Sequence, residues 1–313
     1  MSGEPILVVD LDADAGTHDA DVLARARSGL TQLACPSVAL SAASPCAAAA
    51  ALLEAFDVVI ASEGELAPIL EAVDRTPLAS MALVQLLRHS AALDVHQGLI
   101  AESLVYSTLQ SGPEFAEWLA AREPARPREE RLDPAIVLSR EGDRLRLEFN
   151  RPERHNAFSS EMRDALVEGI QIAVSDPSIR EVIVCAAGPS FCSGGDLDEF
   201  GTLLDPITAH AIRSTRNPGR LLALCADRVR FELQGACVGA GVELPAFASR
   251  VVASHDAYFQ LPEVSMGLVP GAGGTVSIPQ RIGRQRTAYL ALSGQRIDAP
   301  TARTWGLIDE LRP

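Results

Sequence analysis

The sequence predicts an α/β fold. Short apolar segments of strand length alternate with longer segments whose apolar residues recur at the 3.6-residue spacing of a helix. Hydrophobic residues make up 47% of the chain but aromatic residues only 4%, so alanine and leucine supply most of the apolar side chains and favour helices. A chain of 313 residues can bury one substantial core or two modest ones.

The first 64 residues are expected to form a small α/β unit. The apolar segments 6–11, 38–42 and 57–61 predict strands, and the segments 20–33 and 47–56 predict helices between them. Strands and helices that alternate in this way are typical of an α/β unit.

Residues 65–122 are expected to be helical. Apolar residues recur at helical spacing in the segments 66–72, 77–92, 97–109 and 114–122. Residues 123–133 are rich in proline and charged residues, which predicts a linker to a core of residues 134–313. The elements predicted in the core are a hairpin over 135–149, a helix from Ser159 or Ser160 to residue 174, strands over 181–186 and 231–234, and a helix that starts near Gly241.

The charge and the cysteines of the chain indicate which partners and which cellular compartment to expect. The formal net charge of −14 argues against nucleic acid as a partner, and all 27 basic residues are arginine. The six cysteines are scattered without a CxxC pair, which indicates free thiols in a reducing compartment, and no spacing of metal ligands appears. The N-terminus lacks a basic leader and no apolar run reaches about 18 residues, so we expect a cytoplasmic protein that does not bind membranes.

Two glutamates carry the main chemical signal. Glu243 ends a run that is rich in glycine from residue 235 onwards, and Glu263 follows Pro262, shortly before Pro270-Gly271-Ala272-Gly273-Gly274-Thr275. Two carboxyl groups that face one pocket can divide the roles of acid and base, because their surroundings separate their pKa values. Neighbouring glycines let backbone N–H groups approach a ligand closely, as an oxyanion site requires.

Together with two motifs upstream, these runs resemble the crotonase (enoyl-CoA hydratase/isomerase) superfamily. The upstream motifs are Arg151-Pro152-Glu153-Arg154-His155-Asn156-Ala157-Phe158 and Ser190-Phe191-Cys192-Ser193-Gly194-Gly195-Asp196-Leu197. The four motifs stand in the family's order and spacing between about residues 134 and 311. The resemblance implies a crotonase-like fold, which is a spiral of ββα repeats, and an acyl-CoA thioester as substrate. Coenzyme A is then part of the substrate, and no separate cofactor or metal is expected.

The resemblance also implies roles for individual residues. The backbone N–H groups of Gly195 and Ala240 would form the oxyanion hole, Glu243 would activate water, and Glu263 would protonate the α-carbon. The residues implied in binding CoA or the acyl chain are Arg154, His155, Ala157, Asp196, Leu197, Asp198 and Trp118. For Arg154 a structural salt bridge, and for Trp118 plain core packing, fit the sequence equally well.

The two glutamates together favour an enoyl-CoA hydratase, because family members that mainly isomerise double bonds tend to keep only the later acid. The alternatives within the family are isomerisation, dehydration of a hydroxyacyl-CoA and thioester hydrolysis. The wall of the acyl pocket decides among them, and it is expected to include residues 200–220. A non-catalytic CoA-binding subunit is a further alternative. Since the family usually builds trimers or pairs of trimers, we expect a homo-oligomer.

The helical segment bears on the whole architecture. Residues 98–109 and 114–122 resemble the C-terminal helices of a crotonase, which in the family follow the core but here precede it. Three accounts fit: a fused and deleted crotonase unit of which residues 1–64 are a degenerate remnant, a circular permutation, or a helical domain of coincidental similarity. The expected fold is therefore a crotonase-like core whose C-terminal helices are supplied by residues 65–122.

Overall fold

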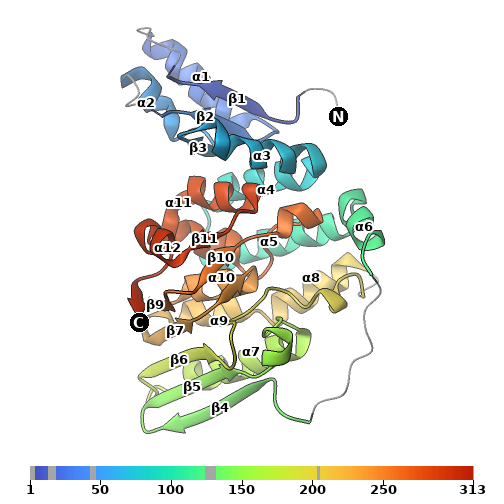
Figure 1. The fold of residues 1–313 in the computed structure, drawn as a ribbon, viewed down its shortest axis with the longest axis vertical. Coiled ribbons are helices and arrows are strands. Elements are labelled where there is room, and N and C mark those ends of the chain that lie inside the picture. Colours follow the sequence, from blue (N-terminus) through green and yellow to red (C-terminus); the bar gives the residue numbers. More distant parts are fainter. Residues whose placement is uncertain (1–3, 13–18, 43–46, 124–131, 203–204, 313) are drawn as a thin grey trace.

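The computed structural model describes residues 4–12, 19–42, 47–123, 132–202 and 205–312. These residues form three β-sheets with helices packed between and around them (Figure 1). One sheet of three strands lies at the N-terminal end, and the other two belong to the C-terminal half of the chain. The linker predicted at 123–133 lies mostly outside the described residues.

The N-terminal sheet is parallel and divides its side chains between two cores. Its elements are β1 (Leu7–Asp10), α1 (Ala20–Gln32), β2 (Ser37–Leu40), α2 (Ala47–Leu53) and β3 (Val58–Ile60), close to the predicted segments. Because successive side chains of a strand point to opposite faces, Val38, Val58 and Ile60 join the main core of the molecule. Ala39, on the other face, packs with Phe56 in a small separate cluster.

The C-terminal half winds back and forth between two sheets. The six-stranded sheet has the order β12-β9-β7-β6-β5-β4 and is parallel except for the hairpin of β4 and β5, while the smaller sheet has the order β11-β10-β8. The chain adds β7 to the large sheet and β8 to the small one, then repeats this with β9 and β10. The strands are β4 (Ile136–Glu141), β5 (Arg144–Phe149), β6 (Glu181–Ala186), β7 (Val229–Leu233), β8 (Ala236–Val238), β9 (Arg250–Ser254), β10 (Tyr258–Gln260), β11 (Ile297–Asp298) and β12 (Glu310–Arg312).

The helices of this half lie between the strands, and those at residues 160–175 and 240–243 are where the sequence predicted helices. They are α7 (Ser160–Ser175), α8 (Pro206–Thr215), α9 (Pro218–Leu224), α10 (Ala240–Glu243), α11 (Gly274–Ser293) and α12 (Ala299–Trp305). The hydroxyl of Ser159 caps α7 by accepting the N–H of Met162 at 3.2 Å. The helix expected from Gly241 is the short α10, which begins one residue earlier.

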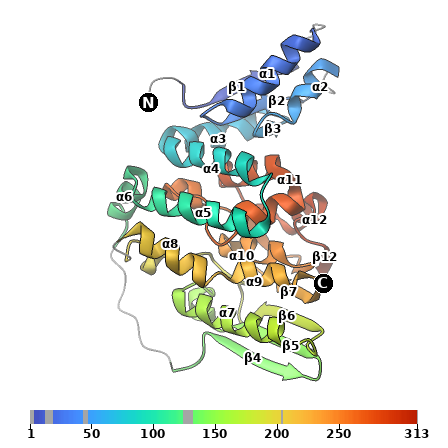
Figure 2. The ribbon, with the colours of Figure 1, turned by 180° about the vertical axis from the view of Figure 1, so that it is seen from behind.

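Four further helices lie between the N-terminal sheet and the core (Figures 1 and 2). They are α3 (Glu63–Arg75), α4 (Pro77–Ser90), α5 (Val95–Gln110) and α6 (Pro113–Ala120). Helices α4 and α5 both pack against α11, and α5 also contacts α8 and α9. Leu83, Leu87 and Leu99 bury their side chains in the main core. Helices that precede the linker therefore cover a face of the core that follows it.

A buried aspartate fastens the N-terminal sheet to the rest of the molecule. The side chain of Asp57 forms ion pairs with Arg88 of α4 and with Arg284 of α11, the latter at 2.8 Å. It also accepts hydrogen bonds from the N–H and the hydroxyl of Ser37, at 2.9 and 2.8 Å. A buried carboxylate is tolerated only when such partners satisfy it, so this contact joins three separate parts of the chain.

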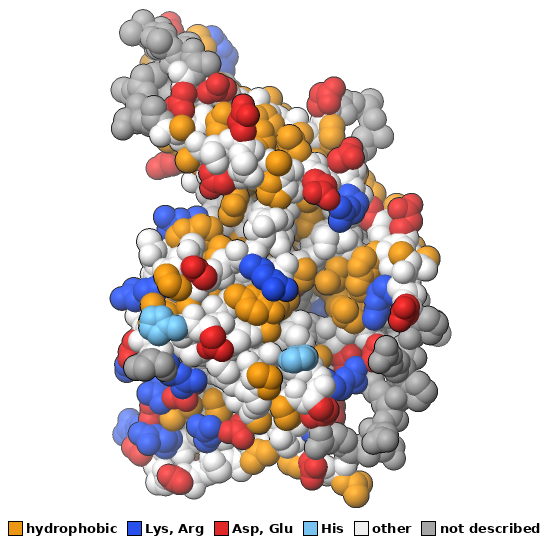
Figure 3. All heavy atoms as spheres, viewed as in Figure 1, with side chains coloured by type: hydrophobic (Ala, Val, Ile, Leu, Met, Phe, Trp, Pro, Cys, Tyr) orange, Lys and Arg blue, Asp and Glu red, His pale blue; other side chains and the backbone are white. Residues whose placement is uncertain are grey.

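No helix in the described part of the chain is long and apolar enough to cross a membrane. On the face drawn in Figure 3, acidic and arginine side chains are interspersed. Cys185, Cys192, Cys225 and Cys237 are buried free thiols, Cys35 is half-buried, and the remaining cysteine, at position 46, lies outside the described residues.

Candidate active site

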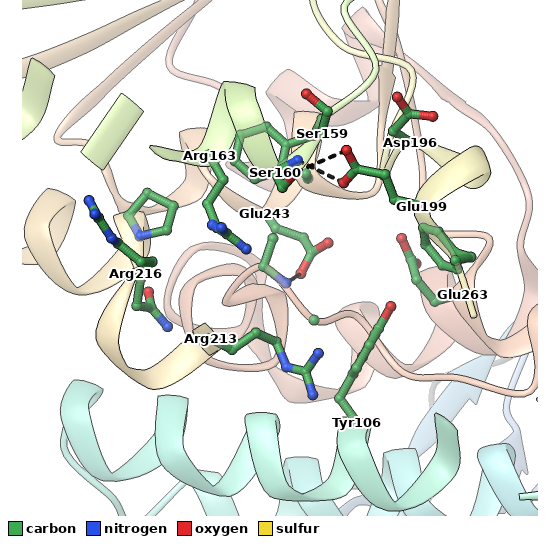
Figure 4. A pocket seen from close by; sticks show the side chains of 18 of the residues that line it. Tyr106, Ser159, Ser160, Arg163, Asp196, Glu199, Arg213, Arg216, Glu243 and Glu263 are labelled. Carbon is green, nitrogen blue, oxygen red and sulfur yellow. Dashed lines mark hydrogen bonds between the residues drawn. The ribbon is translucent and has the colours of Figure 1, made fainter. Parts of the chain in front are cut away.

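A pocket of about 210 Å³ lies between helix α5 and the core (Figure 4). Glu243, Glu263, Gly195 and Ala240 all line it, so the structure brings together the four residues that the sequence singled out for acid–base chemistry and oxyanion binding. Part of the remaining wall comes from the segment 200–220, as expected. Its lining residues there are Phe200, Arg213, Arg216, Asn217 and Pro218.

The backbone N–H groups of Gly195 and Ala240 are the candidate oxyanion donors. Within the described residues neither group donates a hydrogen bond. Ala240 is the first residue of α10, and the first N–H groups of a helix have no carbonyl partner within that helix. Two free donors in one pocket can bind an oxygen that becomes negatively charged.

Short contacts between two loops position these donors. The N–H of Cys192 donates to the carbonyl of Ala236 at 3.0 Å, and the N–H of Val238 donates to the carbonyl of Cys192 at 2.9 Å. The N–H of Phe158 donates to the carbonyl of Gly194 at 2.7 Å. Gly194 has a φ of 96°, and a Cβ atom there would lie 3.4 Å from the carbonyl oxygen of Val238. The positive φ favours glycine at this turn, whereas a Cβ atom would meet the other loop only at an ordinary van der Waals distance.

Glu243 is buried, with 2% of its surface exposed. Its Oε2 accepts the N–H of Ala272 at 2.7 Å and the N–H of Gly274 at 2.9 Å. Burial raises the pKa of Glu243 well above its ordinary value, the negative charges of Glu263 and Glu102 raise it further, and the two N–H donors oppose these effects. Its Oε1 takes part in no hydrogen bond within the described residues and is available to a ligand.

Glu263 begins the turn of 3-10 helix Glu263–Met266 and differs from Glu243 in its partners. Its Oε2 is buried and has no hydrogen-bond partner among the described residues. Burial raises the pKa of Glu263 to about 8, and the charge of Glu102 adds to this rise. Gly239, with a φ of 50°, makes room for the side chain, because a Cβ atom there would lie 2.4 Å from Oε1 of Glu263. A carboxyl group in this state is protonated near pH 7 and can donate its proton.

Sequence reasoning missed a third buried glutamate, Glu102 of α5. Its Oε1 accepts the N–H of Gly273 at 2.7 Å, and its Oε2 accepts the N–H and the hydroxyl of Thr275 at 2.9 and 2.7 Å. Burial raises its pKa to about 7. One signal was present in the sequence: Glu102 follows Leu99 by three residues and therefore lies on the apolar face of the helix, where an unpaired carboxylate is rarely found.

Tyr106 and Arg213 were also missed. Tyr106 of α5 lines the pocket, and a Cβ atom on Gly271 would lie only 2.4 Å from its ring. The guanidinium of Arg213 stacks on this ring, 4.6 Å from its centroid. Neither residue belongs to a recognisable sequence motif. Their contact depends on how α5 packs against α8, which the sequence alone does not show.

Trp118 does not line this pocket. It stacks on Phe115 with 5.8 Å between ring centroids, and it lies 5.8 Å from the ring of Phe200. Arg122 covers its ring at 5.0 Å. Phe200 does line the pocket, so Trp118 packs behind an aromatic side chain of the pocket wall.

Arg154 forms the salt bridge that the sequence left as one of two interpretations. Its Nη2 lies 2.7 Å from Oδ2 of Asp198 and 3.2 Å from Oδ1 of Asp196. Asp196 also lines the pocket, and Arg122 reaches to 3.8 Å from Asp198. These residues form a charged rim beside the unpaired donors.

The other residues expected to bind CoA lie around a left-handed turn. His155 and Asn156 have φ values of 51° and 53°, and the buried Asn156 donates to the carbonyl of Ser190 at 2.9 Å. Nδ1 of His155 lies 3.0 Å from the hydroxyl of Ser190, which gives the histidine a positional contact. Ala157 is partly exposed, and Leu197 is 38% exposed.

The C-terminal half of the chain is similar to known proteins. The sequence profile of the enoyl-CoA hydratase/isomerase family matches residues 144–313. The chain is 32% identical over 180 residues to the 2,3-dehydroadipyl-CoA hydratase of Escherichia coli K12, a match that covers 57% of this chain and 69% of that protein. It is 34% identical over 168 residues to the 1,2-epoxyphenylacetyl-CoA isomerase of the same organism, covering 52% of this chain and 64% of that protein. The crystal structure of an enoyl-CoA hydratase from Thermoplasma volcanium GSS1 superposes with a TM-score of 0.53 at 31% identity, over 57% of this chain and 72% of that one.

These matches confirm the crotonase fold of the C-terminal half. They do not distinguish between a hydratase and an isomerase. The chain spans about two thirds of the length of the relatives named above, and those relatives include a hydratase and an isomerase. More than half of this chain matches the family profile, across the sheets and loops that build the pocket. The chain belongs to the enoyl-CoA hydratase/isomerase family.

Proposed function

We propose that this protein is an enoyl-CoA hydratase, which adds water across the 2,3 double bond of an enoyl-CoA thioester. One observation carries the proposal: two buried carboxyl groups and two unpaired backbone N–H groups share a single pocket. Hydration builds negative charge on the thioester oxygen, and each preorganised donor aimed at that oxygen contributes about 3 kcal/mol to the stability of the transition state.

In the proposed mechanism, the thioester oxygen binds to the N–H groups of Gly195 and Ala240. Burial raises the pKa of both carboxyl groups, but only Glu243 accepts two N–H donors from the loop, so when the pair holds a single proton we assign it to Glu263 and the charge to Glu243. Glu243 is then the base and takes one proton from water through Oε1. The hydroxide oxygen adds to C3 of the acyl chain. Glu263, protonated near pH 7, gives its proton to C2, after which proton exchange between the two carboxyl groups restores the starting state.

Double-bond isomerisation is the second candidate function. It needs the same oxyanion site but only one carboxyl group to move a proton between two carbons. Glu243 would then have no chemical task. The position of Glu243 in the same cavity, with one oxygen held and the other available, favours hydration.

The N-terminal helices have a part in the proposed site. We infer that residues 65–122 take the place of the family's C-terminal helices, since α5 closes the pocket with Tyr106 and supports it with Glu102. The CoA portion would lie along the charged rim of Arg154, Asp196 and Asp198, with His155, Ala157 and Leu197 beside it. The protein is proposed to act as a homo-oligomer, as family members usually do.

The test is hydration of crotonyl-CoA by the purified protein, followed by loss of enoyl absorbance. Glu243→Gln and Glu263→Gln should each lower kcat by at least about 100-fold, the lower range for lost general acid–base catalysis, with nearly unchanged folding. Near-wild-type hydration by either variant would remove that residue from its role. If Glu243→Gln is fully active in moving a double bond, as judged by chromatography of the products, the isomerase assignment replaces the present one.

A further inference from the structure

Arg213 is a half-buried cation in the pocket whose direct partners are all neutral. It donates to the hydroxyl of Ser103 at 3.3 Å, to Oε1 of Gln110 at 3.2 Å and to the hydroxyl of Ser107. No carboxylate of the described residues lies within ion-pair distance of it. A guanidinium carries more N–H donors than these three bonds use, so donors remain available on the side that lines the pocket.

The charge of Glu102 favours the charged form of Arg213, but the Glu102 carboxylate is hydrogen-bonded to other groups. Both of its oxygens accept hydrogen bonds from the chain around Gly273 and Thr275. Removing a cation from water without a direct counter-ion is costly. An anion that enters the pocket would therefore stabilise the charged guanidinium of Arg213.

Two more arginines line the same side of the pocket. Arg163 pairs with Asp164 at 2.9 Å and Arg216 lies 3.8 Å from Glu168, but neither of these acids lines the pocket. Figure 4 shows Arg163, Arg213 and Arg216 on one side of Glu243, and Asp196, Glu199 and Glu263 on the other. The pocket therefore has positively charged side chains on one side of the proposed base and acidic side chains on the other.

The positive side is the side of the acyl chain. Arg213 and Arg216 lie on the side of Glu243 opposite Asp196, the pocket residue that pairs with Arg154 of the rim (Figure 4). An acyl chain whose thioester oxygen lies at Gly195 and whose CoA passes along that rim extends toward these arginines. An aliphatic end there would leave the guanidinium of Arg213 without an anion, whereas a carboxylate would accept bidentate hydrogen bonds from it.

We propose that Arg213, assisted by Arg216 and Arg163, binds a carboxylate at the far end of the acyl chain, so that the preferred substrates are enoyl-CoA thioesters of dicarboxylic acids. This inference deepens the proposed function and rests on acyl-CoA binding in this pocket. The substrate class follows from the positive charge of the arginines in the pocket wall. Arg213 is the specificity-determining residue, and Glu243 and Glu263 act on the double bond as before.

The test measures binding of saturated thioesters, which cannot be hydrated, by calorimetry. Pairs of equal chain length from four to eight carbons differ only in a terminal carboxylate or methyl group, for example adipyl-CoA and hexanoyl-CoA. In one or more pairs the full-length protein should bind the carboxylate form at least about tenfold more tightly. Arg213→Gln should weaken binding of that form by about 10- to 100-fold, the range for a lost charge-assisted contact, and change binding of its methyl counterpart by less than about threefold.

A second variant and a control separate recognition from structure. Arg216→Gln, on the more exposed arginine, should reduce the carboxylate preference in the same direction, whereas the exposed Arg303→Gln of α12 should leave it unchanged. Equal binding of both members of every pair, or an equal loss for both in Arg213→Gln, would overturn the inference even if crotonyl-CoA is hydrated. A carboxylate preference without any hydration of crotonyl-CoA or of an enoyl-CoA with a terminal carboxylate would uphold the inference and refute the hydratase proposal.

Discussion

Glu102 and Glu243 hold one loop between them through alternate N–H groups. The N–H groups of residues 272 and 274 donate to Glu243, and those of residues 273 and 275 donate to Glu102, at 2.7 to 2.9 Å. The loop begins α11, so both carboxylates satisfy helix-terminal donors that would otherwise be buried without partners. Because Glu102 lies on α5 and Glu243 on α10, this loop links the N-terminal helices directly to the proposed base.

Replacement of Glu102, which acts through the loop at residues 272–275, should lower both stability and kcat. In Glu102→Gln the amide keeps a single acceptor oxygen, so a buried N–H of Gly273 or Thr275 loses its partner, which costs about 1–3 kcal/mol in the free energy of unfolding. Displacement of the loop should also move Glu243 and lower kcat by about 10- to 100-fold. Denaturant unfolding and the crotonyl-CoA assay measure the two effects.

The control for this variant is Glu65→Gln. Glu65 accepts the N–H groups of Ala61 and Ser62 at the start of α3, remote from the pocket. It should change stability slightly and activity not at all. A Glu102→Gln protein with normal kcat would show that the loop keeps its position without the second carboxylate.

The hydratase activity should fall at alkaline pH. Glu263 must be protonated to donate its proton to C2, and its pKa is raised to about 8 by burial. Therefore kcat/KM for hydration, which reports the free enzyme, should be lost progressively as the pH rises through about 8. Steady-state kinetics between pH 6 and 10 check this, and a flat profile to pH 10 would assign the proton donor elsewhere.

The same burial makes stability depend on pH. The pKa values of Glu102 and Glu263 rise from 4.5 to about 7 and about 8 on folding, so the folded state holds protons that the unfolded state releases. Their contribution to stability is fully present below pH 4.5 and is lost as the pH rises through 7 to 8. Urea unfolding at pH 6 and pH 9 should give a lower free energy of unfolding at pH 9, and Glu102→Gln should make that difference smaller. An unchanged difference in the variant would contradict the assignment.

Gly239 should matter to catalysis more than to folding. In Gly239→Ala the new Cβ would fall 2.4 Å from Oε1 of Glu263, so the proposed acid must move, and kcat should drop by about 100-fold. Gly142→Ala is the matched control: its φ is also positive, at 61°, and no atom lies within 4 Å of the new Cβ. Both variants should lose about 1 kcal/mol of stability, but Gly142→Ala should hydrate crotonyl-CoA normally. Similar kinetics in the two variants would refute the steric argument.

A fragment of residues 129–313 should fail as an enzyme. Without α5 it lacks Glu102 and Tyr106, and it exposes the apolar surface that α4 and α5 cover. We expect aggregation, or a soluble fragment with less than about one hundredth of the activity of the full chain. A soluble fragment that hydrates crotonyl-CoA at the full rate would show that the helical segment is accessory.

The parts of the site that could be predicted are those encoded in short stretches of sequence. Gly195, Ala240, Glu243 and Glu263 stand in motifs whose glycines and prolines fix the local backbone. The helix starts at α4 and α6 were also foreseeable, since Pro77 and Pro113 each occupy a first helical position.

The rest depends on contacts between distant segments. Arg213 meets its partners in α5 across 103 to 110 residues of sequence, and Glu102 meets Thr275 across 173. No local pattern specifies such pairings, because they are decided by how apolar helix faces pack. The placement of Phe200 rather than Trp118 at the pocket follows from the same packing.

The order of the segments also has a consequence for synthesis of the protein. A ribosome adds about 5–20 residues per second, so Thr275 emerges about 9 to 35 s after Glu102, the carboxylate to which it binds. During that interval the inner faces of α4 and α5 have no core to cover and are open to water and to other chains. Translation speed and chaperone supply are therefore expected to govern the yield of folded protein more strongly than they would if these helices were made last.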